Sequence, residues 1–207
     1  MESVSLLVVD AITFGRTVVG LLTRPYETYR RITKHGRLGE VLFITILAAA
    51  YFALASLIKV AAFRPFLLTE QFLLLIVGAA SGVLLSVGSL WVAGLLLGGS
   101  PAWNKLMIAW VYTLIPTTVW FLSTSMLYVV LPPPRTTSTA GIAFSLLFLV
   151  FSSALLWWKI TLAYLTLRFA LKLDLVRNIV VALACAPILA GWSICMYKLG
   201  IFKVPFL

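Results

Sequence analysis

Five long apolar segments dominate the hydropathy pattern of this chain. They lie at about residues 41–58, 71–97, 106–131, 140–159 and 178–197. A membrane-spanning helix needs about 20 predominantly apolar residues, so segments of this length can cross a bilayer. The pattern therefore predicts an all-α, polytopic membrane protein with five transmembrane helices, built as a single membrane domain over residues 1–207.

The fourth segment stays apolar well beyond one simple crossing, to about Leu171. Two tryptophans and a lysine, Trp157-Trp158-Lys159, are typical of a membrane boundary, where aromatic rings and snorkelling cations gather. The sequence thus predicts a crossing that ends near Lys159 and a helix over 160–171 that continues along or beyond the headgroups.

An amphipathic, juxtamembrane helical region precedes the spans at residues 1–40. Residues 4–22 place Leu7, Phe14 and Val18 on one helical face and Asp10 and Arg16 on another. The length allows a span, but the charges favour a helix that lies in the interface, and both arrangements stay open. A shorter helix follows from Pro25, which suits a first helical turn, to about Lys34.

The composition agrees with a membrane protein, and this affects how the positive net charge is interpreted. The chain is 62% hydrophobic and 11% charged, with a formal net charge of +10. Its basic residues sit beside apolar segments and not on a soluble fold, so we expect anionic lipid headgroups as partners and no nucleic acid.

The basic residues are distributed unequally between the two sides of a five-span chain. One side receives Arg24, Arg30, Arg31, Lys34, Arg37, Lys105, Arg168, Lys172 and Arg177, and the other receives Lys59, Arg64, Arg135, Lys198 and Lys203. Positive residues favour the cytoplasm. We therefore expect a cytoplasmic N-terminus, an external C-terminus and a place in the cell membrane of a prokaryote.

Residues 24–37 form the densest basic cluster and are the candidate contact with lipid headgroups or a protein partner. The contact residues are Arg24, Tyr26, Arg30, Arg31, Lys34 and Arg37. The alternative is that the cluster only sets topology.

Two features of the spans concern helix packing. Gly78, Gly82 and Ser86 form a stripe of small residues that favours close helix approach, either within the chain or in a homo-oligomer. The prolines Pro116 and Pro187 interrupt the third and fifth spans.

Hydroxyl groups follow one face of the third span at Thr113, Thr117 and Thr124. They can line a cavity near Pro116 or bond across a helix interface, and the interface reading carries more weight. Lys159 is the one ionisable side chain at depth, and we expect it to pair with Glu40 at the cytoplasmic boundary.

Residues for catalysis are sparse. The chain has six acidic residues, one histidine and two cysteines, and none of these groups forms a metal-ligand or nucleophile pattern. We expect no enzyme activity and no cofactor.

Three segments together resemble the Yip1 domain family in its prokaryotic form. Arg24-Pro25-Tyr26-Glu27-Thr28-Tyr29 resembles a Pro-x-x-Thr-aromatic entry to the first span. Leu97-Gly98-Gly99-Ser100, followed by Ala109-Trp110-Val111-Tyr112 and Pro116, is similar to a double-glycine loop that leads into the next helix. The third segment is the Trp-bearing fourth helix, polar turn and final span from Trp157 to Ala186, although its turn lacks the His-Gly and Ser often found there.

The resemblance implies five transmembrane helices with a cytoplasmic N-terminus. Eukaryotic relatives act in vesicle trafficking and bind small GTPases. We do not expect that role here, because the region before the first span has about forty residues and the signatures of the eukaryotic members near it are missing. We expect a membrane scaffold or lipid- and partner-binding protein of the Yip1 type, acting in membrane organisation or a trafficking-like process. The alternative is a small transporter or channel subunit with a polar path along the third span.

Overall fold

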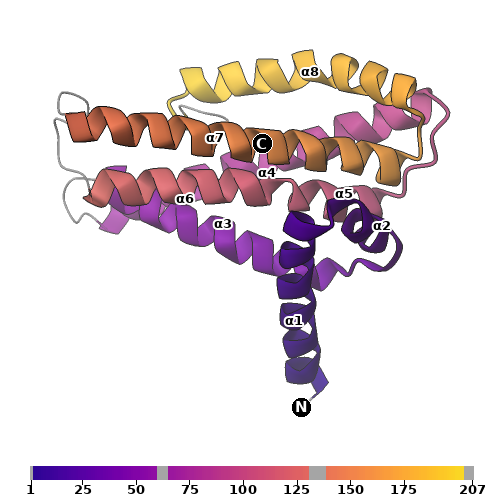
Figure 1. The fold of residues 1–207 in the computed structure, drawn as a ribbon, viewed down its shortest axis with the longest axis horizontal. Helices are drawn as coiled ribbons and strands as arrows, with labels where there is room; N and C mark the ends of the chain where they lie inside the picture. The colour runs from indigo at the N-terminus through magenta and orange to yellow at the C-terminus, as the bar shows by residue number, and fades with distance from the viewer. Residues whose placement is uncertain (1, 60–64, 131–138, 203–207) are drawn as a thin grey trace.

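The structure is a computed structural model that describes residues 2–59, 65–130 and 139–202 (Figure 1). All regular elements in these ranges are helical, which confirms the all-α prediction. They are α1 (Glu2–Thr23), α2 (Pro25–His35), α3 (Leu38–Lys59), α4 (Pro65–Leu96), α5 (Trp103–Tyr112), α6 (Leu114–Val130), α7 (Thr139–Thr166), the π-helix η1 (Leu167–Leu171) and α8 (Leu175–Lys198). Arg64, Arg135 and Lys203 of the charge count lie outside the described residues.

Within the described ranges, five helical segments are long and apolar enough to cross a membrane, as the sequence predicts. They are Leu38–Leu57, Phe66–Leu96, Trp103–Leu127, Gly141–Leu171 and Leu175–Lys198. In Figure 1 they lie roughly alongside one another. In the fourth segment the helix continues past Lys159, as expected, through α7 and η1. The apolar stretch of spanning composition reaches Leu171, whereas the sequence prediction ends the crossing near Lys159.

Helix α1 runs crosswise to the five long helices, beside α2 (Figure 1). Asp10 forms an ion pair with Arg37 (3.3 Å) and Thr17 is buried, so polar groups of α1 turn toward the protein. The face left exposed is apolar and carries Val8, Ile12, Val19 and Leu22. The sequence anticipates two faces on this helix, but the structure directs part of its polar face inward.

A break between α5 and α6 divides the third span at Thr113. Pro116 has no N–H to offer the Tyr112 carbonyl, and its ring crowds that carbonyl, so the helix cannot continue unchanged. The Thr113 N–H donates to the Trp110 carbonyl (2.9 Å), three residues back, and the Thr113 hydroxyl donates to the same oxygen (2.6 Å). The Ala109 carbonyl, which would accept from Thr113 in an unbroken helix, is thereby left for other donors.

The small-residue stripe of α4 is buried within the single chain. Gly78, Gly82 and Ser86 are all buried, and a Cβ on Gly78 would come within 2.8 Å of the Phe202 ring. On the same helix, Ser81 accepts a hydrogen bond from the Trp192 indole of α8 (3.3 Å). The stripe therefore lets α8 and the residues after it pack closely on α4.

The double-glycine loop after α4 also depends on close backbone contact. Gly98 has φ +79, in the left-handed region that favours glycine. A Cβ on Gly99 would lie 2.8 Å from the carbonyl oxygens of both Gly94 and Leu171. The loop is thus pressed against the end of η1, and both contacts are with backbone atoms that cannot rotate away.

We predict that Gly99→Ala destabilises the protein by about 1–3 kcal/mol, since the added methyl group forces the loop away from Leu171. The matched control is Gly88→Ala in α4, where an added Cβ meets nothing within 4 Å. Thermal unfolding of the two purified variants in detergent tests this. Equal melting temperatures for the two variants would contradict the close approach.

Candidate anion-binding site

Helix α2 is held in place by a buried tyrosine from the Pro-x-x-Thr-aromatic segment. Pro25 starts the helix, and its buried face carries Thr28, Tyr29, Ile32 and Thr33. The Tyr29 hydroxyl donates to the Ala109 carbonyl of α5 (3.2 Å). The Thr166 hydroxyl of α7 shares its one proton between that oxygen (3.2 Å) and the Leu162 carbonyl of its own helix (3.0 Å). Burial raises the pKa of Tyr29, so the phenol stays protonated and keeps its donor. One carbonyl freed by the helix break therefore joins α2, α5 and α7.

A basic pocket opens beside this joint, at the end of the bundle where α2 lies. It has a volume of about 350 Å³ and four cations in its wall: Arg30 and Lys34 from α2, Lys105 from α5 and Lys172 after η1. The remaining wall residues are Thr33, Ser100, Ala102, Phe169 and Ala170, so none of the described residues that line the pocket is acidic. Four positive charges around one concavity attract an anion. We call this the basic pocket.

The backbone adds to the positive field of the basic pocket. Ala102 stands at the N-cap of α5 and provides no side-chain hydrogen bond to the first turn. The N–H groups of that turn, which carry the positive end of the helix dipole, are therefore left without a capping side chain next to the pocket wall.

Lys172 enters the pocket wall from a strained backbone. Its φ of 56 and ψ of 37 place it in the left-handed region, which an L-residue adopts at a cost of about 1–2 kcal/mol. It directly follows η1, and π-helical turns of this kind occur often at functional sites. Strain retained at a lysine that lines a basic pocket points to a use for the lysine.

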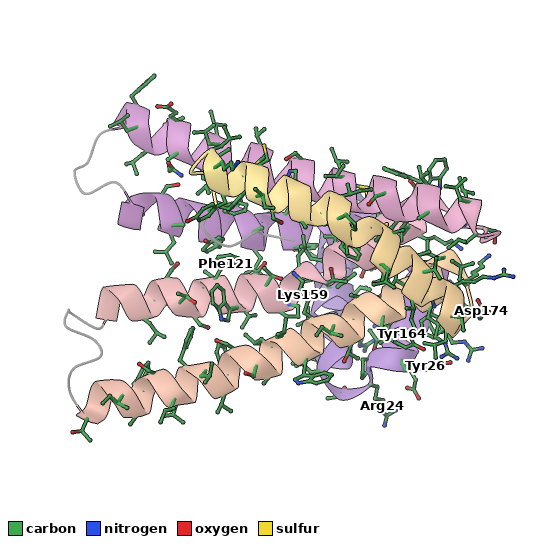
Figure 2. All side chains as sticks on the ribbon, turned by 90° about the horizontal axis from the view of Figure 1, so that it is seen from above. Arg24, Tyr26, Phe121, Lys159, Tyr164 and Asp174 are labelled. Carbon is green, nitrogen blue, oxygen red and sulfur yellow. The ribbon has the colours of Figure 1, made fainter. Side chains whose placement is uncertain are left out.

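The other residues of the predicted basic cluster lie outside the basic pocket. Arg24 pairs with Glu27 (3.7 Å), Arg37 pairs with Asp10, and Arg31 donates to the Thr17 hydroxyl (3.1 Å). The Tyr26 ring meets the Phe169 ring edge-on at 4.9 Å and so supports the pocket wall. Figure 2 shows Arg24 and Tyr26 at the same end of the bundle as Asp174.

Only two residues of the predicted basic cluster, Arg30 and Lys34, line the basic pocket, and two lysines that the sequence analysis did not assign to a site join them. Lys105 and Lys172 were counted only for topology, and they join Arg30 and Lys34 from 71 or more positions away. The one local signal for them was that the double-glycine loop and the turn after the fourth helix both belong to the resembling segments.

The predicted ion pair between Glu40 and Lys159 does not form. Glu40 is buried, accepts a hydrogen bond from the Tyr112 hydroxyl, and accepts another from the Arg37 N–H (3.2 Å), as a capping residue at the start of α3 does. Lys159 donates instead to the Thr117 hydroxyl of α6. The predicted pair fails because the Tyr112 hydroxyl already satisfies the Glu40 carboxylate. Tyr112 lies on α5, 72 residues away in the chain, so the sequence gives no sign of this contact.

A small cavity of about 70 Å³ adjoins Glu40. Arg31, His35 and Thr17 line it together with that carboxylate. Glu40 is buried at this cavity, whereas Arg31 stays exposed and reaches it through its hydrogen bond to Thr17. The polar groups around this cavity link α1, α2 and α3 to one another.

The polar face of the third span is directed largely into its own helix and into α7. The hydroxyl of Thr124 donates to the Trp120 carbonyl one turn back (2.7 Å), as Thr113 does to Trp110. The Trp120 indole donates to the Ser152 hydroxyl of α7 (2.8 Å). Pro187 lies inside the continuous helix α8. Thr113 and Thr124 thus bond within their own span, and the Trp120–Ser152 contact joins α6 to α7.

Five helices of spanning length, a crosswise N-terminal helix and a basic end define a multi-pass α-helical integral membrane protein. The family model described as the Yip1 domain matches residues 19–196. The chain therefore belongs to the Yip1 domain family. The match covers α2, the double-glycine loop and η1, which together build the basic pocket. Searches of the curated proteins and of the solved structures find no match to the chain.

We predict that Tyr112→Phe lowers the free energy of unfolding by about 1–3 kcal/mol, because it leaves the buried Glu40 carboxylate without one of its donors. The control is Tyr197→Phe, since Tyr197 is 63% exposed on α8. Unfolding in detergent micelles measures both. If the two variants unfold alike, Glu40 does not depend on the Tyr112 hydroxyl.

Proposed function

We propose that this Yip1-family protein is a non-enzymatic membrane scaffold that gathers anionic phospholipids at its α2 end. The observation that carries the proposal is the basic pocket, in which Arg30, Lys34, Lys105 and Lys172 surround about 350 Å³ and none of the described lining residues is acidic. A phosphate group satisfies such an arrangement, because charge-assisted hydrogen bonds from Arg and Lys are the strong ones.

The position of the pocket supports a headgroup as its occupant. It lies where α2, the start of α5 and the end of η1 meet, at one end of the spanning helices. A lipid phosphate sits at that depth in a bilayer whose apolar core the five helices cross. The excess of Lys and Arg on this side favours the cytoplasmic leaflet, where anionic lipids concentrate.

Helix α1 supports the same depth. It runs crosswise to the spans, and its exposed face carries Val8, Ile12, Val19 and Leu22. A helix that lies in the membrane surface buries such a stripe in the acyl boundary. Under this proposal α1 and α2 form a collar at headgroup level, and a protein partner is recruited by the lipids it gathers. The third-span hydroxyls described above are engaged in helix contacts, so we base no transport function on them.

Replacing two pocket cations should weaken the binding of anionic lipid. We predict that Lys34→Gln with Lys105→Gln reduces the affinity for dihexanoyl-phosphatidylglycerol by about tenfold or more, since two charge-assisted contacts are lost. Thermal stabilisation of protein in zwitterionic nanodiscs measures the binding, and dihexanoyl-phosphatidylcholine is the uncharged comparison.

The matched control removes two charges from the same end but outside the pocket. Arg16 and Arg24 are both exposed, and neither lines the basic pocket. Arg16→Gln with Arg24→Gln should leave the affinity within about twofold. An equal loss in both double variants would mean that net charge and not the pocket binds lipid. Inverted topology of the pocket variant with unchanged affinity would make the cluster an orientation signal only.

Lys172 offers a test that separates affinity from stability. We predict that Lys172→Gly stabilises the protein by about 0.5–1 kcal/mol, because glycine removes the left-handed strain at a smaller cost in chain entropy. It should nevertheless weaken the binding of phosphatidylglycerol. Lys172→Ala is the control, since it keeps the strain and removes the charge.

The two readouts together decide the role of Lys172. Thermal unfolding with and without the short-chain lipid should give a stable, weak-binding glycine variant and a weak-binding alanine variant without the gain in stability. A glycine variant that binds lipid as well as the parent would show that this lysine has no part in the site.

A further inference from the structure

Lys159 lies inside the bundle and away from the basic pocket. Figure 2 shows it set inward from the end that carries Arg24, Tyr26 and Asp174. It stands seven residues before Thr166, the last residue of α7. At a rise of 1.5 Å per residue, this is about 10 Å along the helix. Its amine therefore sits within the apolar part of the spans, where a charged group marks a functional site by default.

The partner of Lys159 is neutral. Its ammonium donates to the Thr117 hydroxyl of α6 (2.5 Å). Among the described residues no carboxylate pairs with it, and Glu40 is engaged by Tyr112. An ammonium has three donors and a full charge, and one hydroxyl compensates only part of the cost of taking it out of water. An anion is the partner that would complete this environment.

A cavity of about 300 Å³ lies at Lys159, between α6 and α7. Its polar groups are Lys159, Thr117 and Ser152, and its apolar wall includes Trp120, Leu155 and Leu156. Only these two helices supply the wall, and Leu156 is 58% exposed on α7. The cavity can therefore be reached sideways from the acyl chains. A ligand that fits this cavity has a charged head and an apolar body.

We propose that the cavity binds the oxyanion of a single-chain membrane amphiphile, with the head on Lys159 and the chain along α6 and α7. The shared chemistry is an oxyanion attached to an acyl chain, supplied by a fatty-acid carboxylate or by a lysophospholipid phosphate. Thr117 accepts a hydrogen bond from the ammonium. Ser152 lies about two helical turns away along α7, at the Trp120 indole, and lines the cavity there. This site is separate from the basic pocket and does not rest on the function proposed for it.

The experiment measures binding to the full chain in detergent with three probes. Oleate carries a carboxylate, oleoyl lysophosphatidic acid carries a phosphate, and oleyl alcohol is uncharged. Native mass spectrometry and thermal stabilisation should show binding of at least one anionic probe and clearly weaker binding of the alcohol. Oleate alone would assign a carboxylate, lysophosphatidic acid alone would assign a phosphate, and binding of both would mean that charge selects the head.

Two substitutions test the residue. Lys159→Met should reduce the affinity for the anionic probe by about tenfold or more, and Lys159→Arg should retain most of it. The methionine variant is expected to fold, because replacing a buried charge by an apolar side chain of similar size is often neutral or stabilising. Thermal unfolding without ligand checks this expectation, and the arginine variant controls for packing.

Three results would overturn the proposal. The first is unchanged anion binding by Lys159→Met. The second is loss of binding in the Lys34 and Lys105 double variant but not in Lys159→Met, which would assign the probe to the basic pocket. The third is a change of oligomeric state in Lys159→Met with ligand binding unaffected, which would make a second copy of the chain the occupant.

Discussion

A single backbone carbonyl organises the functional end of this protein. Pro116 breaks the third span, Thr113 turns its N–H to Trp110, and the Ala109 oxygen is left to accept from Tyr29 and Thr166. A buried carbonyl without a donor costs free energy, so the break and the two hydroxyls stabilise one another. Three elements that are distant in sequence meet at this atom, and the position of α2 depends on it.

The basic pocket follows from that position. With Tyr29 buried, the adjacent face of α2 brings Arg30 and Lys34 toward Lys105 and Lys172. These cations repel one another, but hydrogen bonds and apolar contacts elsewhere hold α2 in place against that repulsion. Two further hydrogen bonds help to hold these helices together: Arg31 joins α2 to Thr17 of α1, and Tyr112 joins α5 to Glu40 of α3. A rigid scaffold can in this way hold charges together for an anion that is attracted to all of them.

The sequence anticipated the five apolar helices, because their length and composition are local properties of the chain. The pairing of Glu40 with Lys159 was wrong, since charge and depth alone do not reveal a neutral partner. Helix packing instead gives Glu40 the Tyr112 hydroxyl as its partner and gives Lys159 the Thr117 hydroxyl. The Pro-x-x-Thr-aromatic segment was recognised from its residues, yet its meaning as a clamp on Ala109 needed the contact itself.

The sequence by itself determined the number of spans, the helical class and the family, because the bilayer requires long apolar helices and the matching segments are continuous in the chain. Only the tertiary structure decided which cations share a pocket, which carbonyl Tyr29 meets and where Lys159 directs its charge. The physical reason is that hydrogen bonds and electrostatic fields depend on distances in space. Helix packing sets those distances between residues that lie tens of positions apart.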